Sequence, residues 1–142
     1  MAISQEKDNL VIARLFPNEN VMEQLKELCF KHKIQTGIFL FGIGQLGQVE
    51  LGFFKEKGNY MNQKFETPYE LLSLSGNVSL QENGYEFHLH AALGAADKSV
   101  VGGHLISGVV SITLEIAILK TEIKINREIE EETGLKGLSF NF

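Results

Sequence analysis

Residues 87–108 of the 142-residue chain read FHLHAALGAADKSVVGGHLISG and contain three of its four histidines. At its start, the apolar residues Phe87, Leu89 and Ala91 are separated by two histidines. Side chains two positions apart on a β-strand share a face. The alternation therefore predicts a strand that turns its apolar side to a core and both histidines to the opposite side.

Similar segments on both sides of this strand predict a sheet. Short runs of β-branched and aromatic residues bounded by turn residues are typical of strands. Asn83-Gly84 predicts a hairpin turn just before the histidine-bearing strand. One amphipathic helix is expected over residues 21–32, since apolar residues recur at helical spacing after Asn20, a residue type that caps helices. The other predicted strands cover residues 10–15, 37–44, 48–55, 69–80 and 109–120.

Together these elements predict an α+β fold with a central, largely antiparallel sheet and a few packed helices. One domain is expected over residues 1–142, because a chain of this length supports one core. Residues 126–140 are predicted to form one or two helical turns closed by a glycine, and then a short strand. Residues 100–119 are apolar, but His104 and Glu115 lie among them. A buried pair of strands is therefore expected rather than a membrane span.

Charge and cysteine content narrow the class of protein. Thirteen Lys and Arg against eighteen Asp and Glu give a net charge of −5. This charge, without a cluster of basic residues, disfavours binding to a phosphate backbone. The single cysteine, Cys29, allows no intrachain disulfide, and no signal peptide is expected from the first ten residues, so a cytoplasmic protein is expected. Cys29 stands among apolar positions of the predicted helix, which predicts that it is an inert core thiol.

Three of the four histidines, His88, His90 and His104, are the candidate metal ligands. His88 and His90 are expected to have Cα atoms about 6.6–6.8 Å apart along the strand, so that their imidazoles can converge on one ion. His104 follows Gly102-Gly103, where the missing side chains let backbones approach closely. Three histidines with an open fourth position form the catalytic type of zinc site. The alternative is a set of surface or interface histidines, and His32, which stands between lysines, is interpreted as solvated.

Chemistry at such a site requires a proton carrier, and three glutamates are the candidate catalytic residues. Glu86 shares a strand face with the two neighbouring histidines, whereas Glu70 and Glu115 lie on other predicted strands. Solvated strand faces are the simpler interpretation of Glu86 and Glu115. The glycines of residues 42–47 imitate a dinucleotide fingerprint, but a strand follows them instead of the required helix. No nucleotide cofactor is therefore predicted.

Several separate motifs resemble the PPC domain family, also called DUF296, in its stand-alone prokaryotic form. The blocks that carry the resemblance are ELLSLSGNVSL (70–80), EFHLHAALGAADKSVVGGHLISGVV (86–110) and EIEEETGLKGL (128–138). Their order matches along nearly the whole chain. In plants this domain follows an AT-hook, a short basic element that enters the DNA minor groove, and that element is absent from this sequence. The plant block Gly-Arg-Phe-Glu-Ile-Leu is also blurred, since residues 64–72 read KFETPYELL.

The resemblance implies a mostly antiparallel fold, a homotrimer built by packing the sheets, and a DNA-binding description carried over from plants. A more distant resemblance in fold, to acetolactate decarboxylase, implies zinc held by His-x-His and a third histidine, the motif type of His88, His90 and His104. The first hypothesis is therefore a homotrimeric module with a three-histidine zinc site that recruits a protein partner or joins a DNA-associated complex. The alternative is a zinc-dependent lyase or hydrolase acting on a small carbonyl or anionic substrate. A structural or interaction domain without metal is the third hypothesis.

Overall fold

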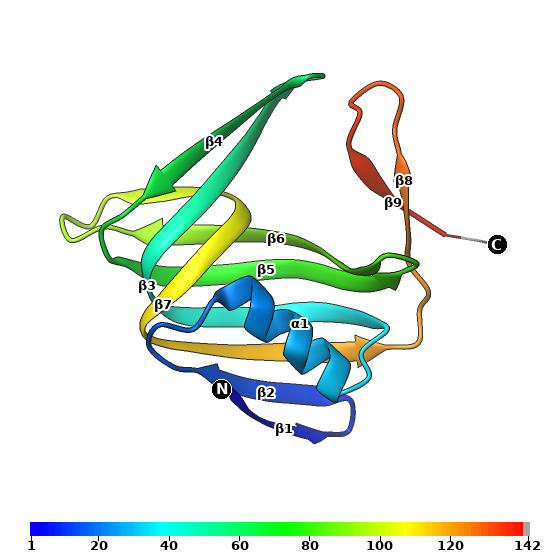
Figure 1. The fold of residues 1–142 in the computed structure, drawn as a ribbon, viewed down its shortest axis with the longest axis horizontal. Helices are drawn as coiled ribbons and strands as arrows, with labels where there is room; N and C mark the ends of the chain where they lie inside the picture. Colours follow the sequence, from blue (N-terminus) through cyan, green and yellow to red (C-terminus); the bar gives the residue numbers. More distant parts are fainter. Residues whose placement is uncertain (141–142) are drawn as a thin grey trace.

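Antiparallel strands make up most of the chain, as the alternating sequence predicts. The computed structural model describes residues 1–140, and all strand pairings in this part are antiparallel (Figure 1). In chain order the elements are β1 (Ile3–Lys7), β2 (Leu10–Leu15), α1 (Val21–Lys31), β3 (Thr36–Glu56), β4 (Asn59–Phe65), β5 (Tyr69–Gln81), β6 (Gly84–Gly94), β7 (Val100–Thr121), β8 (Asn126–Ile129) and β9 (Lys136–Ser139). Within these residues the one helix is short, so the expected α+β fold fits loosely and the expectation of a few helices is wrong.

Two long strands hold the sheet together. The strand order is β1-β2-β7-β6-β5-β3-β4, and β7 also pairs with β3, so β7, β6, β5 and β3 form a closed ring of pairings. The 21 residues of β3 and the 22 residues of β7 bend where their mutual register shifts. Such shifts are typical of β-bulges, which re-aim side chains. The sequence predicted the two halves of β3 as separate strands and residues 100–119 as a pair of strands, whereas each region forms a single strand. It also missed β1 and β4.

The predicted helix is confirmed and covers the inner side of the sheet. Asn20 accepts a hydrogen bond from the backbone N–H of Glu23 at 3.1 Å, as the cap requires. The apolar face of α1 is buried, and burial raises the pKa of the Cys29 thiol to about 12. Cys29 is therefore an inert core thiol, as predicted.

His32, which follows α1, differs from its predicted solvated state. Its side chain is only 9% exposed, and its ring nitrogens lie 2.8 Å from Ser4 Oγ and 2.9 Å from a carboxylate oxygen of Glu6. The sequence suggested solvation because lysines flank this residue. The strand β1, which the sequence did not reveal, folds against the end of the helix and supplies both partners.

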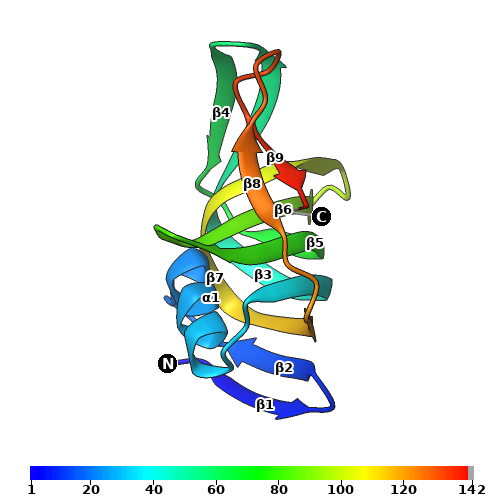
Figure 2. The same cartoon turned by 90° about the vertical axis from the view of Figure 1, so that its right-hand side faces the viewer.

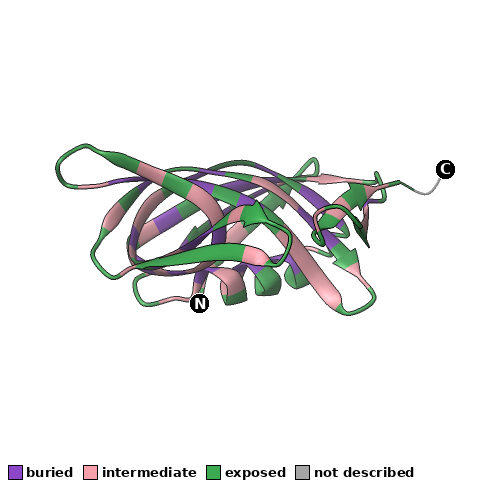
Figure 3. Cartoon of the chain, turned by 90° about the horizontal axis from the view of Figure 1, so that it is seen from above, coloured by how far each residue is buried: buried purple, intermediate pink, exposed green. Residues whose placement is uncertain are grey.

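The core lies between α1 and the sheet, and buried residues alternate with exposed ones along the strands (Figure 3). Leu89 and Ala91 of β6 are buried as predicted. Phe87 is half-buried, packs against the core and contacts Phe39 edge-on at 6.3 Å. The alternation that opens the histidine-bearing strand therefore has the predicted direction.

The end of the described chain forms a hairpin, and the predicted helical turns at residues 126–140 are wrong. Residues 126–129 form β8, which pairs with β9. Gly134 closes the turn between them, with φ +72° and a backbone hydrogen bond from its N–H to the carbonyl of Glu130. The strand pairing satisfies backbone groups that a one-turn helix would leave open. The single domain over residues 1–142 stays a prediction, and its last two residues lie outside the described part.

Two hairpins rise on the same side of the sheet. Figure 2 shows β3–β4 and β8–β9 close together at their outer ends. Lys57, at the tip of the first hairpin, donates a hydrogen bond to the backbone carbonyl of Glu131 in the second. Residues of both hairpins and of β6 line one pocket. Within residues 1–140, no helix has the length and apolar character that a bilayer crossing requires.

Candidate metal centre

The hairpin of β6 and β7 brings the candidate metal ligands together. His90 and His104 are direct cross-strand partners, and His88 lies two residues before His90 on the same face. The pairs of this hairpin are symmetric about Asp97, whose carboxylate accepts bonds from the backbone and hydroxyl of Ser99. The tight turn at Asp97 therefore sets the register that places His104 beside the other two rings.

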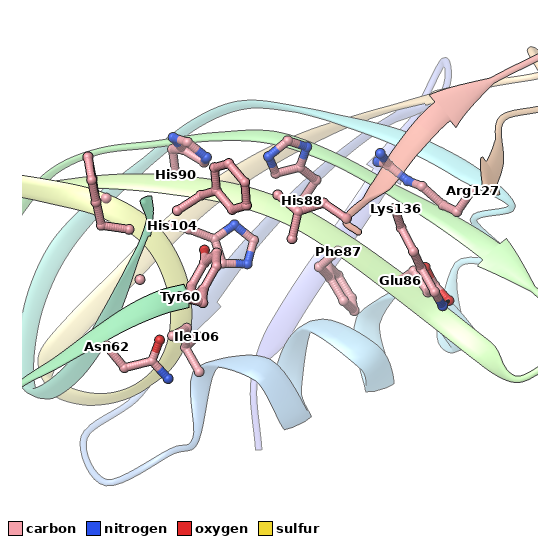
Figure 4. A pocket seen from close by; sticks show the side chains of 15 residues that line it. Tyr60, Asn62, Glu86, Phe87, His88, His90, His104, Ile106, Arg127 and Lys136 are labelled. Carbon is pink, nitrogen blue, oxygen red and sulfur yellow. Dashed lines mark hydrogen bonds and ion pairs between the residues drawn. The ribbon is translucent and has the colours of Figure 1, made fainter. Parts of the chain in front are cut away.

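The three imidazoles form a compact triangle. Their ring centroids are 5.2 Å apart for His88 and His90, 5.6 Å for His88 and His104, and 5.7 Å for His90 and His104. One nitrogen from each ring lies within 4.8 Å of the other two. Figure 4 shows the three side chains pointing toward one another into the pocket. The structure thus places close together the three histidines that the sequence pattern indicated as candidate ligands.

Glycines let three strands approach closely at this point. A Cβ on Gly103 would lie 2.8 Å from the carbonyl oxygen of Gly52, and a Cβ on Gly102 would lie 2.9 Å from that of Ala91. Both distances are below normal contacts for a carbon side chain. The pair before His104 therefore performs the close approach that the sequence predicted for it.

The electrostatics favour the neutral imidazole, which is the form that binds a metal. Partial burial lowers the pKa of His88, and the neighbouring His90 and Arg127 lower it further. Partial burial also lowers the pKa of His104, with additional contributions from His88 and His90. Proton loss from these rings therefore costs less than from a free imidazole.

This donor set fits a transition metal. Zinc binds imidazole nitrogen at about 2.0–2.1 Å, and tetrahedral geometry then places the donor nitrogens about 3.3 Å apart. The nitrogens of the triangle lie within 4.8 Å of one another. Rotation of the side chains, of which His88 and His90 are exposed and His104 is half-buried, would have to close this difference. His88, His90 and His104 are thus able to hold one ion and leave a coordination position open to the pocket.

The pocket beside the triangle has a volume of about 840 Å³ and contains residues that the sequence did not reveal. Tyr60 packs edge-on against His104, with ring centroids 6.3 Å apart, and burial raises the pKa of its hydroxyl. Arg127 and Lys136 lie at the other end (Figure 4). Residues 59–65 read NYMNQKF without a clear alternation, so no local pattern indicated Tyr60 as a pocket residue. No pattern in the sequence identifies the two basic residues as pocket residues.

The three glutamates named as proton carriers do not meet at the site. Glu86 lines the pocket and forms an ion pair with Lys136. Glu70 accepts a hydrogen bond from Gln45 at 2.8 Å and lines a different pocket. Glu115 is exposed, pairs in register with Arg14 and also lies in another pocket. Only Glu86 shares the space of the histidines.

Comparison with known proteins identifies the family to which this fold belongs. Residues 2–122 match the model of the Plants and Prokaryotes Conserved (PCC) domain, so the chain belongs to this domain family. The matched range includes all three histidines and ends before β8.

Solved structures share the fold over nearly the full length. A "putative DNA binding protein" of Bacteroides thetaiotaomicron is 27% identical, with a TM-score of 0.92 and coverage of 99% of this chain and 98% of that one. A metal-containing protein of Archaeoglobus fulgidus is 27% identical, with a TM-score of 0.83 and coverage of 98% and 99%. A plant- and prokaryote-conserved protein of Pyrococcus horikoshii is 29% identical, with a TM-score of 0.79 and coverage of 99% and 97%.

A curated relative is much longer than this chain. The bifunctional protein GlmU of a Synechococcus strain is 31% identical over 123 residues, which cover 85% of this chain. The chain spans only 18% of the length of that relative. The similarity therefore concerns one segment of the longer protein.

Proposed function

We propose that this chain is a metal-binding module in which His88, His90 and His104 hold one divalent transition metal. The observation that carries the proposal is the approach of three imidazole nitrogens to within 4.8 Å of one another. The description of a structural relative as metal-containing supports it. Zinc is the first choice because three histidines and one open position are a common zinc coordination, although imidazole also suits copper, iron and nickel.

The proposal concerns binding rather than a reaction. A metal held by three protein ligands would offer Lewis acidity to an oxygen donor from the pocket. Tyr60 supports the ring of His104, and Gly52 leaves space for Tyr60, because a Cβ there would lie 2.2 Å from its ring. Among the three glutamates, only Glu86 shares the pocket, and Lys136 holds its carboxylate. No observation favours the lyase or hydrolase alternative.

We further propose that the module works as a homotrimer. The outer face of β2, β3 and β7 carries large apolar side chains that are 37–48% exposed, namely Ile12, Ile38, Phe41, Ile43 and Leu119. They alternate with buried residues, so they lie on the side of the sheet away from the core. An exposed apolar patch of this kind is typical of an interaction surface. A contact between sheets of neighbouring copies, as the family resemblance implies, would cover it.

A protein partner fits the charge of the chain better than DNA does. Structural relatives are described as DNA-binding. This chain carries a net charge of −5, and three copies carry about −15, so a phosphate backbone would be repelled at long range. We therefore propose that the module acts through protein contacts in a cytoplasmic complex.

Metal analysis of the purified protein tests the metal site. After refolding with zinc and removal of free metal, we expect about one zinc ion per chain. His90→Ala and His104→Ala should each abolish stoichiometric binding, because two remaining imidazoles hold zinc poorly. His32→Ala is the matched control, since His32 lies outside the pocket and should leave the zinc content unchanged. A wild-type content below about a tenth of an ion per chain contradicts the proposal.

A further inference from the structure

One end of the pocket carries positively charged side chains. Arg127 and Lys136 come from β8 and β9 and line the same pocket as the three histidines. Both lie beyond residues 2–122, the range that matches the family. A volume of about 840 Å³ lies within the range of small-molecule sites. The pocket therefore has room for an organic ligand next to a metal ion.

A register pair fixes the position of Arg127. Its guanidinium donates a hydrogen bond to the side-chain oxygen of Asn77, and Asn77 is the cross-strand partner of His88. Directly opposed residues of antiparallel strands have Cα atoms about 4.5–5.5 Å apart, with side chains on one face. The hydrogen-bond partner of Arg127 is thus paired with a candidate metal donor. Figure 4 shows the guanidinium directed toward His88.

Among residues 1–140, the charge of Arg127 has no close counter-ion. Within residues 1–140, no carboxylate lies within 4.0 Å of its guanidinium. Its hydrogen-bond partner, Asn77, is neutral. Partial burial lowers the pKa of Arg127, and the more distant Glu86 opposes this effect only in part. A partly desolvated guanidinium without a carboxylate partner favours a bound anion.

The other charged residues of the pocket, Glu86 and Lys136, do not neutralise the charge of Arg127. Lys136 is paired with Glu86, so the two of them contribute no net charge, and Arg127 leaves the pocket with one positive charge. The sides of the pocket are mainly apolar, with Phe53, Ile106 and Leu135 among its residues. A ligand with a charged group at Arg127 and a carbon chain along these side chains fits this surface.

We propose that the pocket binds a small dicarboxylate, with one carboxylate on the open position of the metal and the other on Arg127. The inference rests on the proposed metal site, because that site receives the first carboxylate. The planar fork of a guanidinium matches the two oxygens of the second carboxylate. Oxygen donors readily complete the coordination of zinc.

Titration of the metal-loaded protein with succinate tests the proposal. Cobalt(II) is loaded in place of zinc, because its visible spectrum reports a change in coordination, and calorimetry on the zinc-loaded protein gives a second readout. Butyrate is the matched control, with the same number of carbons and one carboxylate fewer. We expect succinate to change the cobalt spectrum and to bind at least about tenfold more tightly than butyrate, since a charge-assisted bond to arginine is gained.

Two arginine variants locate the second carboxylate. Arg127→Gln should weaken succinate binding about tenfold, to the level of butyrate, and leave the cobalt content unchanged. Arg127→Lys should recover only part of the affinity, because lysine keeps the charge and loses the fork. Arg14→Gln, which changes the only other arginine in the sequence, should bind succinate like the wild type.

The outcomes separate this inference from the metal site. A wild-type protein that takes up no metal contradicts the proposed function itself. Full metal uptake with equal affinity for succinate and butyrate overturns the dicarboxylate site alone. Unchanged succinate affinity in Arg127→Gln also overturns it. Tighter binding of inorganic phosphate than of succinate would overturn the assignment to a carboxylate ligand.

Discussion

At the scale of single residues, Glu6 connects three elements of the fold. Its carboxylate accepts hydrogen bonds from Lys120 of β7 at 2.5 Å and from the ring of His32 at 2.9 Å. The hydrogen bond from Lys120, followed by that from His32, holds the pKa of Glu6 below its ordinary value of 4.5. This contact ties the edge strand β1 to the helix end and to the centre of the sheet.

The lowered pKa of Glu6 predicts a dependence of stability on pH. A carboxylate with a depressed pKa in the folded state stabilises the fold above its ordinary pKa, and the contribution is lost as the pH falls through the lowered value. Glu6→Gln should therefore lower the free energy of unfolding at pH 7, and the difference from wild type should shrink below pH 4.5. Urea unfolding at several pH values measures this. Glu82→Gln, on the exposed β5–β6 turn, is the control, and a difference that persists unchanged into acid would contradict the prediction.

The candidate ligands show what residue patterns reveal. The period of two placed His88 and His90 on one face, and Gly102-Gly103 marked a close backbone approach at His104. Asp97-Lys98-Ser99 is a turn motif, but the sequence alone did not fix how many residues the turn would use. The distance between His104 and the other rings depends on that number, because one residue of slip moves a side chain to the other face.

The position of Arg127 in the pocket could not be predicted from the sequence, for a different reason. Its place in the pocket results from the β8–β9 hairpin folding back over β5 and β6, and from contact with Asn77, fifty positions away in the sequence. Long-range packing of this kind has no local pattern. The same limit hid the partners of His32.

At the scale of elements, Gly76 shows how the strand carrying His88 is held. Gly76 of β5 has φ +139°, and a Cβ there would lie 1.9 Å from the carbonyl oxygen of His88. Two unfavourable effects of a side chain therefore coincide: a backbone conformation that favours glycine and a clash with β6. Strand β6 can accommodate a methyl group at position 76 only by moving away from β5.

Gly76→Ala is expected to destabilise the fold and to weaken the metal site together. Overpacking alone costs about 1–3 kcal/mol, and the displaced backbone carries His88 away from the other two rings. Thermal unfolding and zinc content measure the two effects. Gly47→Ala is the matched control, because a Cβ at Gly47 meets Ser111 at an ordinary 3.5 Å. Equal effects of the two substitutions would show that the close approach at Gly76 has no special role.

The elements themselves were only partly predictable. The helix, its Asn20 cap and the hairpin before β6 followed from local sequence. Residues 37–55 looked like two strands because glycines interrupt them, but bulges let β3 continue through the interruption. The short strand expected near the end of the chain is β9, but β8 was missed, because a strand of four residues is too short for a clear alternation.

At the scale of the whole molecule, the apolar outer face gives the assembly a test. Phe41 is 40% exposed and shares Ala117 of β7 as a cross-strand partner with Ile12. These residues form the middle of the patch that the proposed trimer would cover. A charge placed there would remain desolvated in the assembled state.

Phe41→Asp should convert the proposed trimer to single chains. We expect light scattering to give three times the chain mass of 15.8 kDa for wild type and one chain mass for the variant. Phe30→Asp is the matched control, because Phe30 is 80% exposed on the outer side of α1 and should leave the mass unchanged. A wild-type protein that scatters as one chain would contradict the homotrimer.

The family match ends at residue 122, and this boundary separates two groups of residues that line the pocket. All three candidate metal donors precede this boundary, and both basic pocket residues follow it. Under the proposed binding mode, substitutions in the β8–β9 hairpin would change the preference among ligands and leave the candidate metal donors in place. Ligand preference and metal binding would then be altered independently of each other.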